Sequence, residues 1–221
     1  MSAGLCDDRS GMAPGPPATM ERVTHFYRPA EGHGLPHDPF NAIVGPRPIG
    51  WISSLGADGS RNLAPYSFFN AFNYTPPLVG FSSVGHKDSV TNLEATGEFV
   101  WNLVTRDLAA AMNETSTMDA VDEWERSGLE PGESTVVKPP RVAAAPVSFE
   151  CVVTQIVRLQ DKDGGEVDAW MTFGEVVGVH IDEAFLVDGV YDTALARPVM
   201  RGGGPSAYFE VGERFDLRRP S

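Results

Sequence analysis

Two long segments of β-branched and aromatic residues, in the second half of the chain, constrain the fold most. Residues 146–159, "PVSFECVVTQIVRL", and residues 167–181, "VDAWMTFGEVVGVHI", have the composition of extended strands. Between them lies the polar, glycine-containing segment "DKDGGE", at residues 161–166, which is typical of a turn. The sequence therefore predicts a long β-hairpin here.

The first half of the chain repeats this pattern with shorter strands. Residues 47–55 read as a strand, and the Asp58–Gly59 pair suits a tight hairpin turn. Residues 61–73 form the expected return strand, which Pro65 interrupts, so we expect a sheet edge or a bulge there. Two further apolar strands are expected, at residues 77–84 and 98–104.

Helices are expected between and after these strands. In residues 87–97, Asp88 or Ser89 can cap the start of a helix and Gly97 can close its end. Three other segments have helical character and are short, namely residues 106–116, residues 119–128 and the region near 193–198.

Hairpin-connected strands with few helices predict a mainly β fold, a closed or half-closed antiparallel barrel. Regular strand–helix–strand alternation, which would indicate a parallel sheet, is missing. Residues 1–20 are rich in glycine, proline and alanine, so we expect a flexible leader before one domain at residues 21–221.

The charge of the chain limits its partners. With 17 Lys and Arg against 30 Asp and Glu, the net charge is −13, which disfavours nucleic acid and anionic membranes as general partners. Cys6 and Cys151 do not suggest a disulfide framework, and no apolar stretch approaches a membrane span, so we expect a cytoplasmic protein.

The common nucleotide and nucleophile motifs do not occur. There is no GxGxxG, no GxxxxGK[ST] and no GxSxG. His33 and His37 lie in a loop-like segment, which favours solvated side chains over a metal site, and we expect no metal. The "GGG" at residues 202–204 is more typical of a flexible connection than of a phosphate cradle.

A phosphate site is indicated where the strand over residues 77–84 meets the next helix. Hydroxyl groups, one cation and free N–H groups at a helix start suit a phosphate. The alternative is that Asp88 and Ser89 cap the helix while Lys87 is a solvated neighbour. The candidate residues are Ser82, Ser83, Lys87, Asp88 and Ser89.

More polar residues on the preceding strands can bind the edge of a planar ring or a polyol chain. They are Asn62, Tyr66, Ser67 and Asn70, and across the hairpin Arg47 and Trp51 offer a guanidinium and a flat apolar wall. Each has a structural alternative, with Trp51 in the core, Asn62 in a turn and Arg47 on the surface. Together they describe a site for a flat, polar-edged, phosphorylated ligand.

These motifs, in this order, resemble the flavin reductase-like family of FMN-binding split-barrel proteins. The resemblance rests on "PRPIGWISS", "NLAPYSFFN", "PPLVGFSS", "KDS", "TGEFVWNLV", "GEVVGVHID" and "RGGGPSAYFEV". It covers about residues 38–208. The insert at residues 113–134 and the "APYSFFN" motif are nearest to the flavoredoxin-like branch.

The resemblance implies a six-stranded antiparallel split barrel with FMN at a homodimer interface. It implies that Ser82, Ser83, Lys87 and Ser89 hold the phosphate, and that Asn62, Tyr66, Ser67 and Asn70 contact the ribityl chain or ring edge. Along the isoalloxazine it places Pro48, Trp51, Ile52 and Ser53. His180 matches a position on the nicotinamide side, although an ordinary hydrogen bond at a strand end is the alternative, and Arg201 reaches the site from the tail.

Three functions follow from this resemblance. The first is an NAD(P)H-dependent flavin oxidoreductase with NADH or NADPH as co-substrate and a monooxygenase or other redox partner. The second is a flavoredoxin-like electron carrier without NAD(P)H oxidase activity. The third is a split-barrel oxidase of a phosphorylated amine, resembling pyridoxamine phosphate oxidase.

Overall fold

The computed structural model describes residues 23–117, 119, 121–212 and 214–220. The chain divides into two units, residues 1–36 and residues 37–221. The described part of the first unit holds one short 3-10 helix, η1 (Pro29–Glu31). The expected leader at residues 1–20 lies outside the described residues, and the domain boundary at residue 21 stays a prediction.

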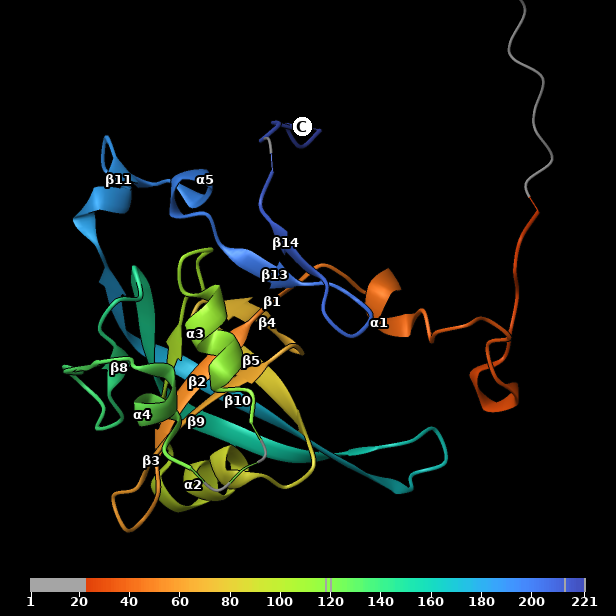
Figure 1. Ribbon diagram of the computed structural model, residues 1–221, viewed down its shortest axis with the longest axis horizontal. Coiled ribbons are helices and arrows are strands. Elements are labelled where there is room, and N and C mark those ends of the chain that lie inside the picture. Colours follow the sequence, from red (N-terminus) through yellow and green to blue (C-terminus); the bar gives the residue numbers. More distant parts are fainter. Residues whose placement is uncertain (1–22, 118, 120, 213, 221) are drawn as a thin grey trace, which may run out of the picture. The chain divides into compact units, whose positions relative to one another are not determined.

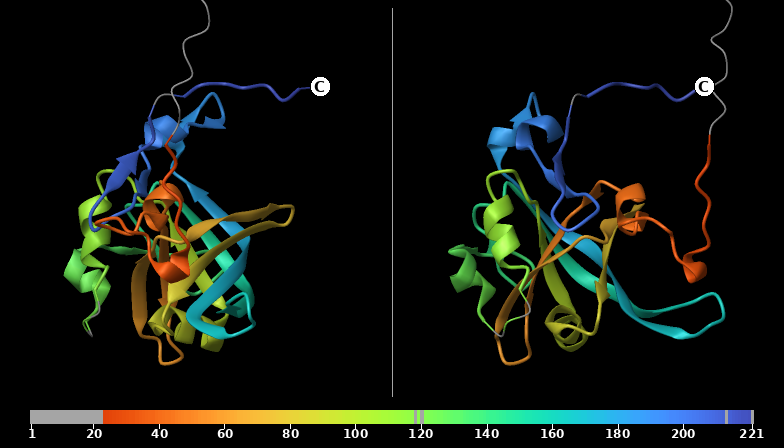
Figure 2. Two further views of the ribbon diagram at one scale, coloured as in Figure 1. Left: turned by 90° about the vertical axis from the view of Figure 1, so that its right-hand side faces the viewer. Right: turned by 45° about the vertical axis from the view of Figure 1, so that its right-hand side comes forward.

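A seven-stranded antiparallel sheet builds the second unit and confirms the mainly β class (Figure 1). Its strand order is β3-β2-β6-β9-β10-β5-β4. Figure 2 shows the sheet curled around itself, as a barrel with an open seam. The strands are β2 (Gly50–Leu55), β3 (Arg61–Tyr66), β4 (Phe69–Tyr74), β5 (Pro77–Val84), β6 (Glu98–Asn102), β9 (Val147–Gln160) and β10 (Glu166–Ile181).

The count of seven strands, against the expected six, comes from one segment of the chain. The segment expected as one return strand bends at Ser67 and Phe68 and becomes two strands, β3 and β4. Pro65 lies in β3, which is at one edge of the sheet. An edge strand tolerates proline, because proline has no N–H to donate to a further strand. The predicted edge position of Pro65 is therefore confirmed.

The long hairpin of β9 and β10 is confirmed, and it contains a register shift near its end. Val176 pairs with Cys151, whereas Gly178 pairs with Glu150, so Val177 is an extra residue in β10. Such a bulge reverses which face the following side chains occupy. Consequently His180 lies on the outer face of the sheet, together with Glu150.

The helices are short and peripheral. At the start of α2 (Asp88–Thr96) the N-cap residue is Lys87, and no side chain caps the helix, so the predicted cap by Asp88 or Ser89 is wrong. Gly97 closes α2 in a left-handed conformation, as predicted, with φ of 72°. The other helical segments are α1 (Phe40–Ile43), α3 (Ala109–Glu114), α4 (Glu123–Ser127), η2 (Glu183–Phe185) and α5 (Thr193–Ala196).

Short strands form three smaller sheets beside the barrel. The pairs are β7 with β8 and β11 with β12, and the third sheet joins β1, β13 and β14. Their bounds are β1 (Arg47–Pro48), β7 (Pro131–Gly132), β8 (Arg141–Val142), β11 (Leu186–Val187), β12 (Val190–Tyr191), β13 (Val199–Arg201) and β14 (Tyr208–Glu210).

Two hydrophobic cores lie on opposite faces of the same barrel wall. Inside the barrel, Ile52, Phe81 and Phe99 pack together. On the outer face, Trp51 packs with Trp124 of α4 and Met112 of α3. Because successive residues of a strand point to opposite faces, Trp51 and Ile52 belong to different cores.

Candidate functional site

Six polar side chains meet inside the barrel, at the end where α2 lies. We call this group the polar cluster, and its members are Ser54, Asn62, Tyr66, Ser83, Ser89 and Asn92. The Asn62 amide donates to Ser89 Oγ at 2.8 Å, and the Asn92 amide donates to Ser54 Oγ at 3.1 Å. Four of the six were predicted from the sequence.

The polar cluster is buried, and Tyr66 connects its two sides. The Tyr66 hydroxyl lies near the hydroxyls of Ser89, from α2, and Ser83, from β5. Burial raises the pKa of Tyr66 above its usual value, and the two serine hydroxyls oppose that rise. Tyr66 therefore stays a neutral phenol at physiological pH.

The start of α2 lies directly beside the polar cluster and is open to solvent. Lys87 and Asp88 are exposed, whereas Ser83 and Ser89 are buried. Ser83 Oγ donates to the carbonyl of Gly85 at 2.8 Å, which holds the turn before the helix. Since no side chain caps α2, the N–H groups of its first turn carry a partial positive charge toward solvent.

A cavity of about 580 Å³ opens next to this helix start. Asn62, Asp88 and Asn92 line it from the polar cluster and α2, and Arg61 and Glu123 line it from β3 and α4. Burial raises the pKa of the Glu123 carboxyl above its usual value. The cavity thus offers amide, carboxyl and guanidinium groups for a polyhydroxylated ligand.

A second, smaller cavity of about 140 Å³ is lined by Tyr66 of the polar cluster and by two other predicted residues, Ser67 and Arg201. The Arg201 guanidinium donates to carbonyls of the 202–207 loop, among them Ala207 at 2.8 Å, and lies 5.1 Å from the centre of the Tyr208 ring. Arg201 therefore shapes the cavity wall while it orders its own loop.

Arg47 has a structural role, because its guanidinium holds several backbone segments together. It is buried, and it donates to the carbonyls of Asn41, Val44, Ser67 and Gly202. Burial, and next the charge of Arg201, lower the pKa of Arg47 from its usual value. A direct contact of Arg47 with a flavin stays a prediction.

The glycine-rich segment after Arg201 is packed, so the expected flexible connection is wrong. A Cβ atom at Gly203 would lie 2.5 Å from the Cα atom of Ala42 in α1. Glycine is needed there because two backbone segments approach closely.

The structure does not bring the residues predicted along the isoalloxazine onto one face. Trp51 and Ser53 point to the outer face of β2 and Ile52 points into the barrel, and all three side chains are fully buried. The Trp51 ring donates to Thr115 Oγ1 at 3.0 Å. Pro48 is half-buried in β1. Contact between these four residues and a flavin stays a prediction.

Two remaining candidates lie apart from the polar cluster. Ser82 is half-buried and neighbours Ser83 on β5, so its side chain points to the opposite face. Asn70 is exposed on β4, and its amide oxygen accepts from the N–H of Ala71 at 2.9 Å. Their predicted contacts with FMN stay predictions.

His180 is hydrogen-bonded to a buried carboxylate. Its Nε2 lies 2.5 Å from Glu150 Oε1, and the histidine side chain is 28% exposed whereas Glu150 is fully buried. This contact is the ordinary hydrogen bond at a strand end that the sequence left open as the alternative for His180. A nicotinamide contact is compatible with it, because the other ring nitrogen, Nδ1, makes no contact with Glu150.

Ser54, Asn92 and Glu150 were not predicted from the sequence. For Ser54 a signal existed, since strand alternation puts Ser54, rather than Ser53, on the same face as Ile52. For Glu150 the signal was an acidic residue within an apolar strand, which requires a partner when buried.

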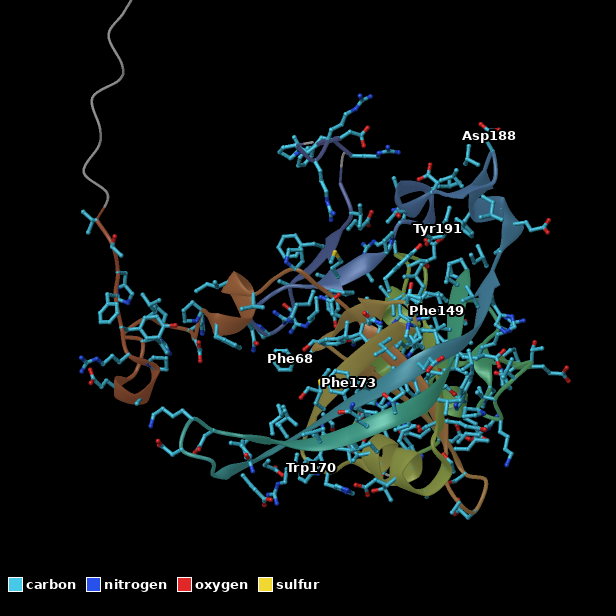
Figure 3. All side chains as sticks on the ribbon, turned by 180° about the vertical axis from the view of Figure 1, so that it is seen from behind. Phe68, Phe149, Trp170, Phe173, Asp188 and Tyr191 are labelled. Atoms are coloured by element: carbon cyan, nitrogen blue, oxygen red, sulfur yellow. The ribbon has the colours of Figure 1, made fainter. Side chains whose placement is uncertain are left out.

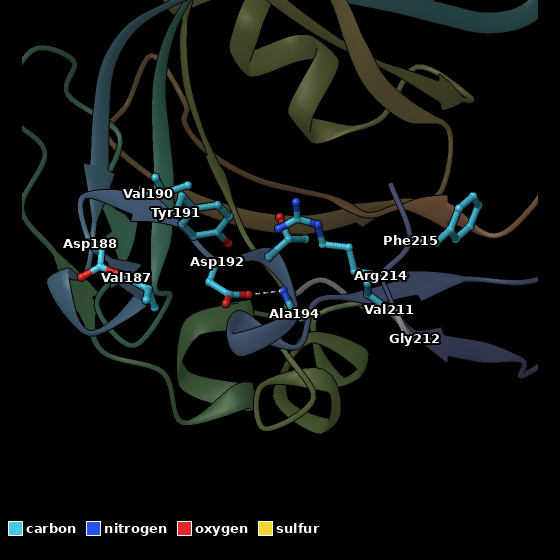
Figure 4. A pocket seen from close by; sticks show the side chains of 11 residues that line it. Val187, Asp188, Val190, Tyr191, Asp192, Ala194, Val211, Gly212, Arg214 and Phe215 are labelled. Carbon is cyan, nitrogen blue, oxygen red and sulfur yellow. Dashed lines mark hydrogen bonds between the residues drawn. The ribbon is translucent and has the colours of Figure 1, made fainter. Parts of the chain in front are cut away.

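A further cavity lies away from all predicted site residues. Its volume is about 760 Å³, and β11, β12, α5 and the residues Val211, Gly212, Arg214 and Phe215 line it (Figure 4). In Figure 4, Asp192 caps α5 by accepting from the N–H of Ala194, at 2.9 Å. Figure 3 shows Asp188 and Tyr191, which line this cavity, far from Trp170, the strand partner of Ser83.

Comparison with known proteins identifies the class. Residues 45–194 match the family model described as "Flavin reductase like domain". The fold is similar to nitrilotriacetate monooxygenase component B from Bacillus cereus, with 29% identity, a TM-score of 0.79, and 89% of this chain and 100% of that one covered. It is also similar to 2-nitrobenzoate 2-nitroreductase NbaA from Pseudomonas fluorescens, with 32% identity, a TM-score of 0.73, and 82% and 88% of the two chains covered.

The chain therefore belongs to the flavin reductase-like family, as the sequence motifs indicated. Flavoredoxin of Desulfovibrio vulgaris (Miyazaki F) shares the fold, with a TM-score of 0.68 at 19% identity over 78% of this chain and 90% of that one. A solved flavin reductase from Shewanella frigidimarina described as having a split barrel domain also shares the fold, with a TM-score of 0.73, 22% identity, and 82% and 90% of the two chains covered, which confirms the split-barrel architecture. Among the described residues, no helix is long and apolar enough to cross a membrane.

Proposed function

We propose that this protein binds FMN and transfers electrons from NADH or NADPH through it to an acceptor. The observation that carries the proposal is the uncapped start of α2 beside Lys87, on a chain whose net charge is −13. A cation and free N–H groups at this position suit a phosphate. The family membership supports a flavin as the molecule that bears it.

In this proposal, residues around α2 would bind the phosphate and the ribityl chain of FMN, and a second cavity would receive the ring. Lys87 and the first-turn N–H groups would bind the phosphate, and Ser83 and Ser89 would hold the turn and the helix in place behind them. Asn62, at the cavity of about 580 Å³, would bind hydroxyls of the ribityl chain. The cavity lined by Tyr66, Ser67 and Arg201 is the candidate position for a ring edge.

The protein supplies binding and orientation in this proposal. When bound, FMN supplies a ring nitrogen that accepts a hydride from a reduced nicotinamide and then passes the two electrons on. Hydride transfer needs no acid–base residue on the protein, which agrees with the lack of a nucleophile motif in the sequence. The cytoplasm, where pyridine nucleotides are abundant, stays the expected location.

An electron carrier without NAD(P)H oxidase activity is the second candidate. Its support is that the sequence has no GxGxxG motif and that the resemblance assigns a single residue, His180, to the nicotinamide side. A carrier would keep the same FMN site and would receive its electrons from another protein.

The absorption spectrum of the purified protein tests both candidates. We expect a yellow protein, or one that becomes yellow with FMN, and we expect NADH or NADPH to bleach it without oxygen. A colourless protein without measurable FMN affinity would contradict both candidates. Tightly bound FMN that dithionite reduces, but NADH and NADPH do not, would favour the carrier.

We also propose a homodimer that forms through the outer face of β4, β5, β9 and β10. Phe72, Val84 and Val157 are 53%, 59% and 43% exposed on these strands. The Phe72 ring packs edge-on against the Phe173 ring, with 5.1 Å between the ring centres, which extends the apolar surface onto β10. A second copy of the chain would bury this surface.

A redox partner such as a monooxygenase is a further proposal. It is supported by the similarity to the Bacillus cereus protein, which is a monooxygenase component.

Phe72→Glu is expected to shift the protein from dimer to monomer, because a charge would be buried in the interface. Sedimentation velocity over a range of concentrations measures the change. The exposed Phe40→Glu in α1 serves as the control, since it adds the same charge elsewhere. A monomeric unaltered protein, or a dimer that Phe72→Glu leaves intact, would contradict this surface.

A further inference from the structure

The hairpin of β11 and β12 projects from the barrel and presents apolar side chains to solvent (Figure 1). Val187 pairs with Val190 across a two-residue turn, Asp188 and Gly189, whose φ angles are 50° and 77°. Two positive φ angles are typical of a type I′ turn, which fixes the register of a short hairpin. Val187 and Val190 are 48% and 67% exposed. Because an isolated two-stranded hairpin is only marginally stable in water, we expect another surface to cover these valines.

The same part of the chain is acidic. Residues 181–196 contain four acidic and no basic residues, namely Asp182, Glu183, Asp188 and Asp192. Asp182 and Asp192 accept hydrogen bonds from N–H groups at the starts of η2 and α5, whereas Glu183 and Asp188 are exposed. The cavity of about 760 Å³ borders the hairpin. A complementary occupant therefore combines apolar side chains with positive charge.

Residues 214–220, "RFDLRRP", have this complementary composition, and we call them the arginine segment. Phe215 and Leu217 are 80% and 85% exposed. In an extended chain, residues two apart point to the same side, so these two side chains form one apolar face. Three arginines against one aspartate give the segment a net charge of +2, on a chain whose net charge is −13.

The arginine segment borders the cavity of its own copy without filling it. Among the described residues, the hydrogen bonds of the segment stay within it, where Arg214 donates to Asp216 at 2.9 Å. Figure 2 shows the chain after β14 leaving the barrel as an extended segment. In Figure 4, Phe215 lies at the far end of the cavity from Val187 and Val190, and its ring is directed away from them.

We propose that the arginine segment of one copy docks on the β11–β12 hairpin of a second copy. Phe215 and Leu217 would enter the cavity beside the second copy's valines, and the arginines would face its exposed carboxylates. Because each copy has one segment and one hairpin, a two-fold pair of copies makes this contact twice.

A segment of seven residues makes a small interface, so it strengthens the association of two copies and does not hold them together alone. The surface on β4, β5, β9 and β10 stays the main dimer contact. The inference requires neither a flavin nor a nucleotide, so its test is independent of the proposed redox function.

Photo-cross-linking of the full chain tests which copy receives the segment. Phe215 is replaced by p-benzoylphenylalanine, and the products are separated by mass under denaturing conditions and mapped by mass spectrometry. We expect a product of twice the chain mass, in which residue 215 is joined to residues 182–192. The same label in place of Phe40, which is 56% exposed in α1, is the control and should not reach the hairpin.

Two results of this experiment would overturn the proposal. A product of single chain mass, joined to residues 182–192, would mean that the segment covers the hairpin of its own copy. The lack of any cross-link from residue 215 to residues 182–192 would mean that the segment does not dock there.

Charge reversal tests the ionic part of the contact. Arg218→Glu with Arg219→Glu changes the net charge of the segment from +2 to −2. Glu183→Lys with Asp188→Asn makes the hairpin less acidic and keeps a residue that tolerates positive φ in the turn. Photo-labelled copies carry the segment variant, and affinity-tagged copies carry the hairpin variant.

We expect the reversed segment to cross-link to the unaltered hairpin about 5- to 10-fold less than the unaltered segment does. The hairpin variant should lower the yield with the unaltered segment and raise it with the reversed segment. Lys138→Glu with Lys162→Glu is the matched control, because it changes the net charge equally at two exposed positions outside both surfaces. An equal loss in this control, or a hairpin variant that changes both yields in the same direction, would overturn the proposal.

Discussion

Lys87→Ala is expected to weaken FMN binding about 10- to 100-fold and to leave riboflavin binding nearly unchanged. The physical reason is that FMN and riboflavin differ in the phosphate alone, and Lys87 is the exposed cation at the start of α2. Adding Ser83→Ala should enlarge the loss, because Ser83 Oγ holds the carbonyl of Gly85 in the turn before the helix. Fluorescence quenching of both flavins measures the two affinities.

Lys162→Ala is the matched control for this prediction. Lys162 lies in the turn between β9 and β10 and its side chain is 85% exposed, so its replacement changes the net charge equally without touching α2. Equal losses of FMN and riboflavin affinity in Lys87→Ala would contradict the phosphate assignment. Equal FMN losses in the two lysine variants would assign the effect to net charge.

Acidification from about pH 5 to pH 2 is expected to remove on the order of 2–3 kcal/mol of unfolding free energy through Glu150 alone. In the folded protein, burial raises the pKa of Glu150, but hydrogen bonds from His180 and three backbone N–H groups outweigh burial and lower the pKa to about 2, below its ordinary value of 4.5. A depressed pKa stabilises the fold at pH values above the unfolded pKa. The stabilisation is lost as the pH falls from 4.5 towards 2, where the folded protein must also bind the proton.

Urea unfolding over a series of pH values checks this expectation. The difference in unfolding free energy between the unaltered protein and Glu150→Gln should shrink as the pH falls through this window. Glu98→Gln should show a much smaller dependence, because Glu98 accepts a single loop hydrogen bond at the barrel surface. A difference that stays constant from about pH 6 to about pH 2.5 would show that Glu150 does not stabilise the fold through its charge.

Much of the fold could be predicted because its signals are local. The β-branched segments of β9 and β10, the Asp58–Gly59 turn and the Gly97 helix end each depend on a few neighbouring residues. Gly59 has φ of 84° and donates to the carbonyl of Gly56 at 2.9 Å, as a tight turn requires. The division of β3 from β4 was not predicted, because the bend at Ser67 depends on the Arg47 guanidinium that binds the Ser67 carbonyl.

The candidate site was predictable as a set of residue types and less so as an arrangement. Asn62, Tyr66, Ser83 and Ser89 do come together, as consecutive strands with polar ends suggested. Ser54, which was not predicted, belongs to the polar cluster, whereas Ser53, predicted along the isoalloxazine, points to the other face of the strand. Trp51 and Ile52 were likewise expected to line one ligand surface. In the structure they belong to two different hydrophobic cores.

By itself, the sequence determined the antiparallel barrel, the family, and the polar residues at the start of α2, since composition and spacing along the chain carry those signals. Tertiary structure alone decided which side chains share a face and which charges are paired. The bulge at Val177 turns His180 toward Glu150, and the loop over residues 133–138 supplies three N–H groups to the same carboxylate. These contacts join residues 13 to 30 positions apart, and their energies depend on burial, which exists only after the chain has folded.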